Sequence, residues 1–140
     1  MVERRAYGAR GLVYLLDTNA CIDFLERRSV PLVERIDKAF GKLGVSVISA
    51  AELLVGTKTS SNPVRDRRTI DAFLTNLDVY DFDMATARVY GDTVRGIGVK
   101  RKSFDRLIGV QAITLELILV TRNSKNFADV PGLKVENWTV

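Results

Sequence analysis

The sequence predicts a single α/β domain built as a three-layer α/β/α sandwich around a mostly parallel central sheet. Short, continuous apolar runs, which are typical of buried parallel strands, alternate with longer segments whose apolar residues follow helical spacing. The 140 residues, 46% of them hydrophobic, suffice for one core but not for two. We therefore expect one domain over residues 12–140, preceded by a flexible N-terminal extension over residues 1–11.

The first predicted strand lies at residues 13–16, where an apolar run ends at Asp17. The Asp-Thr-Asn sequence that follows favours a turn and a helix start, so we expect a short helix over residues 21–25. Pro31 suits the first position of the next helix, whose apolar residues continue at helical spacing until Gly41 ends it.

The second predicted strand covers residues 45–49, which are rich in Val and Ile, and a helix over residues 50–55 follows it. Residues 65–77 place their apolar side chains at helical spacing and predict an amphipathic helix. A short apolar run predicts a third strand at residues 79–82.

The C-terminal half continues the same alternation. Asp83 is expected to cap a helix that reaches Val94, and residues 96–103, with two glycines and a basic run, predict a loop. A buried helix is then expected over residues 105–115. The last two strands are expected at residues 118–121 and 133–135.

The composition excludes several kinds of chemistry. The chain contains no histidine, which rules out Ser-His-Asp and Cys-His nucleophiles and zinc sites with a His ligand. Its single cysteine, Cys21, excludes an intrachain disulfide and suits a reducing compartment. With no apolar run of membrane-spanning length and a charged N-terminus, we expect a cytoplasmic protein without a membrane contact. A formal net charge of +4 is compatible with a polyanionic partner.

Polar residues follow the predicted strands at the edge where an α/β sheet gathers its functional groups. Asp17 ends the first strand and Asn123 follows the fourth, while Glu52 and Asp105 can join them from the starts of flanking helices. Three carboxylates at one edge repel each other unless a hard dication such as Mg²⁺ or Mn²⁺ binds them. Such an ion lowers the pKa of a bound water and stabilises charge in an in-line displacement.

Each of these residues also has a purely structural interpretation. The spacing of Ser49 and Glu52 matches a helix-capping box, and Asp17 could cap the first helix. Asp105 would suit the dipole of a first helical turn, and Asn123 could be an ordinary turn residue. The joint placement of the four residues at one edge is what favours a functional site.

Four motifs occur in order along the chain: YLLDTN at residues 14–19, SAAELLVG at 49–56, FDRLIGVQA at 104–112 and LVTRNSKNF at 119–127, followed by VPGL at 130–133 and Trp138. Together they resemble the motifs of the PIN-domain family, and most closely those of its VapC-type toxins. The resemblance covers nearly the whole chain. Three features depart from the family pattern: an N-terminal extension of about a dozen residues, a shortened segment before Asp105, and uncharged Asn123 and Asn126 in the last motif.

The resemblance implies a PIN-like fold and an Mg²⁺-dependent endoribonuclease, with Mn²⁺ as a possible substitute. Asp17, Glu52 and Asp105 would form its acidic core, with Asn123 at the fourth position. It further implies an RNA substrate, a cognate VapB-type antitoxin, and a homodimer or higher even oligomer. Because Asn123 and Asn126 are uncharged, we expect a single metal ion completed by RNA phosphate, and a catalytically weak or inactive binding module stays open as an alternative.

Further residues are weaker candidates for contacts with the substrate. Basic side chains near Asp105 could contact RNA phosphates or could simply form a solvated loop. Thr18 could contact the substrate or cap the first helix. The complete set is Thr18, Lys100, Arg101, Lys102, Arg106, Thr121 and Arg122.

Overall fold

The computed structural model describes residues 11–57, 60–100 and 103–140. These residues form a five-stranded sheet in the order β3-β2-β1-β4-β5, and each neighbouring pair is parallel. The strands are β1 (Tyr14–Leu16), β2 (Leu43–Ser46), β3 (Asp78–Tyr80), β4 (Ile118–Val120) and β5 (Val135–Glu136). The predicted α/β class with a parallel sheet is confirmed.

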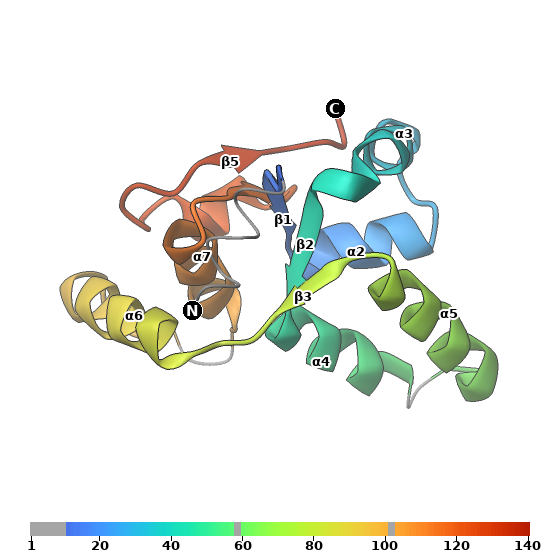
Figure 1. Cartoon of the computed structure of the whole chain (residues 1–140), viewed down its shortest axis with the longest axis horizontal. Coiled ribbons are helices and arrows are strands. Elements are labelled where there is room, and N and C mark those ends of the chain that lie inside the picture. Colours follow the sequence, from blue (N-terminus) through green and yellow to red (C-terminus); the bar gives the residue numbers. More distant parts are fainter. Residues whose placement is uncertain (1–10, 58–59, 101–102) are drawn as a thin grey trace.

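Helices cover both faces of this sheet (Figure 1). They are α2 (Thr18–Leu25), α3 (Val30–Ala39), α4 (Val47–Gly56), α5 (Pro63–Thr75), α6 (Met84–Ile97) and α7 (Asp105–Thr114), with the short 3₁₀ turns η1 (Phe40–Lys42) and η3 (Ser124–Phe127). Helices α2, α3 and α5 share one core cluster with the sheet. Helix α7 and η3 pack on the opposite face, and α6 packs on the outside of α7.

Strand β1 is buried on both faces, which explains its uninterrupted apolar sequence. Leu15 and Leu16 are both fully buried, but they belong to different core clusters because successive side chains of a strand point to opposite faces. The C-terminal Trp138 closes the first cluster, where its ring makes an edge contact with Tyr14 at a centroid distance of 4.8 Å.

The boundary between β2 and α4 differs from the prediction. The strand ends at Ser46, whose hydroxyl accepts a hydrogen bond from the Ile48 backbone N–H at 3.0 Å and caps the helix. Residues 47–49 therefore belong to the helix, although Val and Ile favour strands, because the cap and the tertiary packing override that preference. The predicted capping box is also wrong, since Ser49 lies inside α4 rather than at its N-cap.

Three other boundaries shift by a few residues. Helix α5 begins at Pro63 because Asn62 caps it, and α6 continues to Ile97, inside the predicted loop. The last strand is Val135–Glu136 rather than residues 133–135. The predicted caps at Asp17 and Asp83 are confirmed, since each carboxylate accepts a hydrogen bond from a backbone N–H three residues on.

Two remaining expectations concern the ends and the surface of the chain. The predicted N-terminal extension lies outside the described residues except for Gly11. In the described part of the chain, no helix combines the length and the apolar character needed to cross a bilayer.

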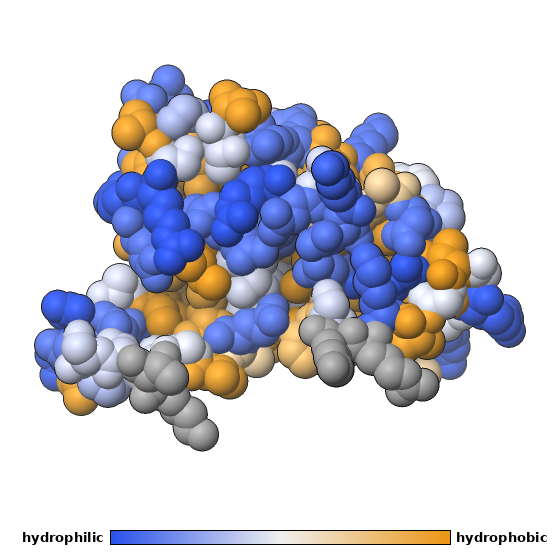
Figure 2. All heavy atoms as spheres, turned by 180° about the vertical axis from the view of Figure 1, so that it is seen from behind, coloured by the Kyte–Doolittle hydropathy of each residue, from blue (hydrophilic) through white to orange (hydrophobic). Residues whose placement is uncertain are grey.

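Figure 2 shows that hydrophilic residues cover much of the rear face, while hydrophobic residues are more continuous in its lower half.

Candidate active site

The topology gathers the functional residues at the carboxyl ends of β1 and β4. In the sheet order, β1 and β4 are neighbours. The chain leaves β1 towards β2 on one side and leaves β4 towards β5 on the other, so the carboxyl ends of β1 and β4 form a switch point, where α/β sheets bind ligands. Asp17 directly follows β1, and its backbone N–H donates to the Val120 carbonyl at 3.0 Å. The turn after β4 therefore lies beside Asp17.

Asp17 is a buried carboxylate, with only 2% of the residue exposed. Its Oδ1 accepts a hydrogen bond from the Ala20 backbone N–H at 2.7 Å, so the predicted capping role is confirmed. Burial raises the pKa of Asp17 to about 6; hydrogen bonds from Thr121 and Ala20 oppose this rise, the negative charge of Asp105 adds to it, and Arg122 lowers it. The site thus contains a carboxylate whose negative charge is poorly compensated.

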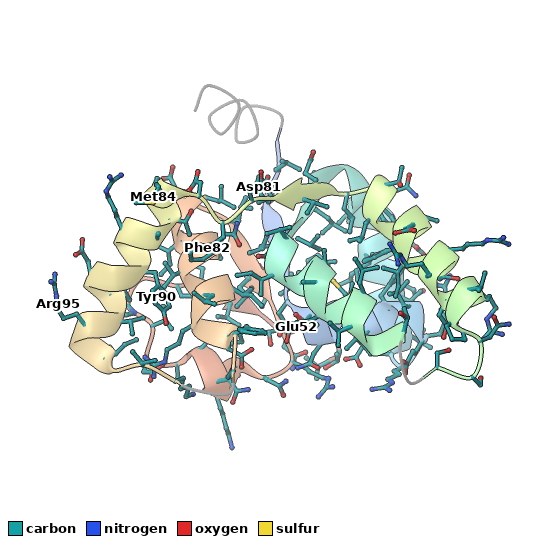
Figure 3. The ribbon with its side chains drawn as sticks, turned by 90° about the horizontal axis from the view of Figure 1, so that it is seen from below. Glu52, Asp81, Phe82, Met84, Tyr90 and Arg95 are labelled. Carbon is teal, nitrogen blue, oxygen red and sulfur yellow. The ribbon has the colours of Figure 1, made fainter. Side chains whose placement is uncertain are left out.

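Glu52 is held against Thr18, the residue that follows Asp17, by a pair of hydroxyl groups. The Thr18 hydroxyl donates a hydrogen bond to Glu52 Oε1 at 2.5 Å, and Ser49 Oγ lies 2.9 Å from Thr18 Oγ1. Because Thr18 uses its proton for Glu52, Ser49 is the donor of the second bond. Figure 3 shows Glu52 near the middle of the molecule, on the side where α4 faces α7. Thr18, predicted as a substrate contact, thus positions Glu52.

Asp105 is the first residue of α7 and is half-buried. Its Oδ2 accepts a hydrogen bond from Asn126 Nδ2 at 3.2 Å. The helix is anchored to the sheet by Gln111, whose buried amide donates to the backbone carbonyls of Tyr80 and Asp81. These bonds fix the position of α7, and with it that of Asp105, relative to the carboxyl end of β3.

Asn123 and Asn126 have different structural roles in the last motif. The Asn123 backbone N–H donates to Thr121 Oγ1 at 3.0 Å and its carbonyl accepts from the Asn126 N–H, so Asn123 shapes the turn, as its structural interpretation predicted. The side chain that reaches Asp105 belongs to Asn126, which the sequence reasoning did not include in the site. Its position one 3₁₀ turn after Asn123 was the signal available in the sequence.

The described residues contain no group of three or more Asp, Glu or Cys side chains close enough together to hold a metal ion. The expected meeting of Asp17, Glu52 and Asp105 at one point is therefore absent from this structure. Asp105 is nevertheless close enough to Asp17 that its negative charge raises the pKa of Asp17. Since Mg²⁺ is commonly bound by one or two carboxylates plus water and substrate phosphate, the oxygen donors of this pair fit that ion.

The predicted substrate contacts fall into different environments. Arg106 is buried, with 6% of its side chain exposed, and forms an ion pair with Asp129, so it has a structural partner and its contact with RNA phosphates stays a prediction. Thr121 is also buried and bonds Asp17 instead of facing a substrate. Lys100 is exposed, and Arg101 and Lys102 lie outside the described residues. Arg122 is 39% exposed, and its Nε donates to Asp23 Oδ2 at 2.7 Å.

Comparisons with known proteins place the chain in a family. The PIN domain family matches residues 14–133. The tRNA(fMet)-specific endonuclease VapC of Shigella flexneri is 32% identical over 91% of this chain and 99% of the relative. Ribonuclease VapC2 of Haemophilus influenzae is 34% identical over 91% of this chain and 98% of the relative.

Two solved structures share the fold. One is DNA-bound VapBC from Salmonella typhimurium, which matches with a TM-score of 0.82 and 28% identity over 91% of this chain and 98% of that chain. The other is VapBC2 from Rickettsia felis bound to a DNA fragment from its promoter, with a TM-score of 0.80 and 28% identity over 91% of this chain and 99% of that chain.

Proposed function

The chain belongs to the PIN-domain family, in its VapC-type branch, and we propose that it is a metal-dependent endoribonuclease, the toxin of a toxin–antitoxin pair. One observation carries the proposal: a buried, poorly compensated carboxylate, Asp17, lies at the switch point of the sheet beside Asp105. The similarity to ribonucleases of the VapC type supports the reaction class, and the similarity to the solved VapBC complexes supports a VapB-type antitoxin as partner.

The reaction would use the residues of the site in separate roles. Asp17 and Asp105 would hold one Mg²⁺ or Mn²⁺, which when bound lowers the pKa of a water molecule and stabilises charge on the phosphoryl oxygens. Glu52 Oε1 already accepts a hydrogen bond from Thr18, so we assign Oε2 to orienting the attacking water and accepting its proton. Asn126 keeps the Asp105 carboxylate in place through its bond to Oδ2.

The direct test is an RNA-cleavage assay with the purified protein, freed of antitoxin. We expect cleavage of single-stranded RNA, transfer RNA or ribosomal RNA with Mg²⁺ or Mn²⁺ and none in EDTA, because both carboxylates act through the ion. Cleavage that persists in EDTA would contradict the metal-dependent mechanism. Metal-supplemented protein that binds RNA without cutting it would instead support the binding-module alternative, which the separation of the three carboxylates keeps open.

The hydroxyl pair beside Glu52 gives a second test. Thr18→Val keeps the side-chain shape but removes the donor to Glu52 Oε1, so the carboxylate loses its fixed orientation. We expect kcat to fall about 10- to 100-fold, the usual cost of removing a group that orients a metal-site residue, with little change in KM. Thr93→Val on the remote helix α6 is the matched control and should retain the parental kcat. An unchanged kcat in Thr18→Val would show that Glu52 needs no support from Thr18.

A further inference from the structure

An open depression with a volume of about 630 Å³ lies where the end of α2, the turn into α3 and the turn after β4 meet. It is lined by Asp23, Arg28, Ser29, Val30, Pro31, Arg122 and Thr139. We propose that this arginine depression binds a backbone phosphate of the RNA, outside the phosphate that reacts. The inference rests on the proposed ribonuclease function and extends it to a second contact with the substrate.

The depression is built around a buried carboxylate. Asp23 is 3% exposed, and such a group is costly inside a protein unless a cation pairs with it. Arg122 supplies that cation through a 2.7 Å bond from Nε to Oδ2, and Arg28 Nη1 lies 3.7 Å from Oδ1. Two guanidinium groups from segments far apart in the sequence thus meet at one buried acid.

The geometry of Arg122 suits phosphate binding. Asp23 uses Nε, which orients the guanidinium and leaves Nη1 and Nη2, with four of its five N–H donors, for other acceptors. A planar pair of such donors matches the oxygens of a phosphate. The side chains of Arg122 and Arg28 are 39% and 53% exposed, so both can be reached from solvent. Glu26 also pairs with Arg28, but it is itself 54% exposed and does not line the depression.

The position of the depression favours RNA over an acidic protein segment as the occupant. Arg122 follows Thr121, which bonds the Asp17 carboxylate, and the charge of Arg122 lowers the pKa of Asp17. RNA is a polyanion and is repelled by the carboxylates of Asp17 and Asp105, so the fixed positive charge of Arg122 near them offsets that repulsion. Phosphate contacts of this kind fix the register of the strand and carry no sequence information.

The test measures binding of a fluorescein-labelled, single-stranded oligoribonucleotide in EDTA, so that no cleavage occurs. Arg122→Gln and Arg28→Gln should each weaken binding about 5- to 10-fold at low salt and reduce the slope of log K against log salt by about 0.7, the share of one phosphate on a single strand. Arg95→Gln is the matched control. Its side chain is also paired with a carboxylate, Asp92, at 3.0 Å, but it lies at the outer end of α6, far from Glu52 (Figure 3), and should change binding less than about twofold.

Two further variants separate binding from folding. Arg122→Gln leaves Asp23 buried with a weakened partner, so the double variant Asp23→Asn/Arg122→Gln removes both charges together, and circular dichroism verifies its fold. The double variant should bind RNA as weakly as Arg122→Gln. Asp23→Asn alone keeps the arginine but frees its orientation, so we expect about threefold weaker binding with the parental salt slope.

The outcomes distinguish the subsite from the enzyme. Parental RNA affinity in both Arg122→Gln and Arg28→Gln overturns the subsite, even if the parent cleaves RNA. Parental RNA affinity combined with lost antitoxin binding overturns it as well and assigns the depression to the protein partner. A parent that binds RNA but never cleaves it refutes the nuclease proposal, while weakened binding in both variants still supports the phosphate subsite.

Discussion

Asp17→Asn is expected to reduce RNA cleavage by about 100-fold or more, with Mg²⁺ or Mn²⁺ present. The amide cannot supply the negative charge that the ion needs, and loss of a metal ligand removes several kcal/mol of transition-state stabilisation. The helix cap survives, because Asn Oδ1 can still accept the Ala20 backbone N–H. The loss should therefore appear in kcat/KM of a correctly folded protein.

The measurement is a time course of cleavage for parent and variant at equal folded concentration. Asp92→Asn is the matched control, because the same substitution is made at a carboxylate that is 79% exposed on α6, and it should retain the parental rate. An Asp17→Asn protein that cleaves RNA as fast as the parent would refute the assignment of Asp17, and with it the metal site proposed here.

The same substitution is expected to stabilise the metal-free protein by about 3 kcal/mol at neutral pH. The pKa of Asp17 is about 6 in the folded protein, against an ordinary value of 3.8, so the folded state binds the proton more tightly than the unfolded chain. The stability contributed by protonated Asp17 is fully present below about pH 3.8 and is lost as the pH rises through 6. Above that range the buried charge costs about 1.36 kcal/mol per unit of raised pKa.

Urea unfolding in EDTA at several pH values measures this effect. The variant should exceed the parent in free energy of unfolding near pH 7, and the difference should shrink towards zero near pH 4. Saturating Mg²⁺ should then stabilise the parent and not the variant, since only the parent would bind the ion in its folded state. A difference between the two proteins that is the same at every pH would show that burial does not raise the pKa of Asp17.

Both predictions arise from one conflict in the site. Burial makes the Asp17 charge unfavourable in the free protein, and the same burial strengthens its attraction for a cation. The ionised carboxylate of Asp17, a residue that we assign to catalysis, thus lowers the stability of the metal-free folded protein. A variant that is more stable and also inactive is the expected signature of such a residue.

Much of the fold could be predicted from local patterns in the sequence. The apolar run before Asp17 predicted a strand buried on both faces, and the carboxylates of Asp17 and Asp83 predicted two helix starts. Both signals are local, because burial on two faces demands consecutive apolar residues and a cap bonds to a backbone group three residues away. The boundary at Ser46 was missed because Val and Ile favour a strand while a capping hydroxyl decides where the helix begins.

The sequence by itself determined that Asp17 follows a buried strand of a parallel sheet and that no histidine can take part in a site of this protein. Only the tertiary structure decided which side chains meet there. It paired Arg122 with Asp23 across 99 positions, joined Thr18 to Glu52, and buried Arg106 against Asp129. No local pattern encodes such pairs, because the partner of a side chain depends on how distant segments pack. A local sequence pattern also cannot distinguish a basic residue that faces solvent from one that is paired with a buried acid.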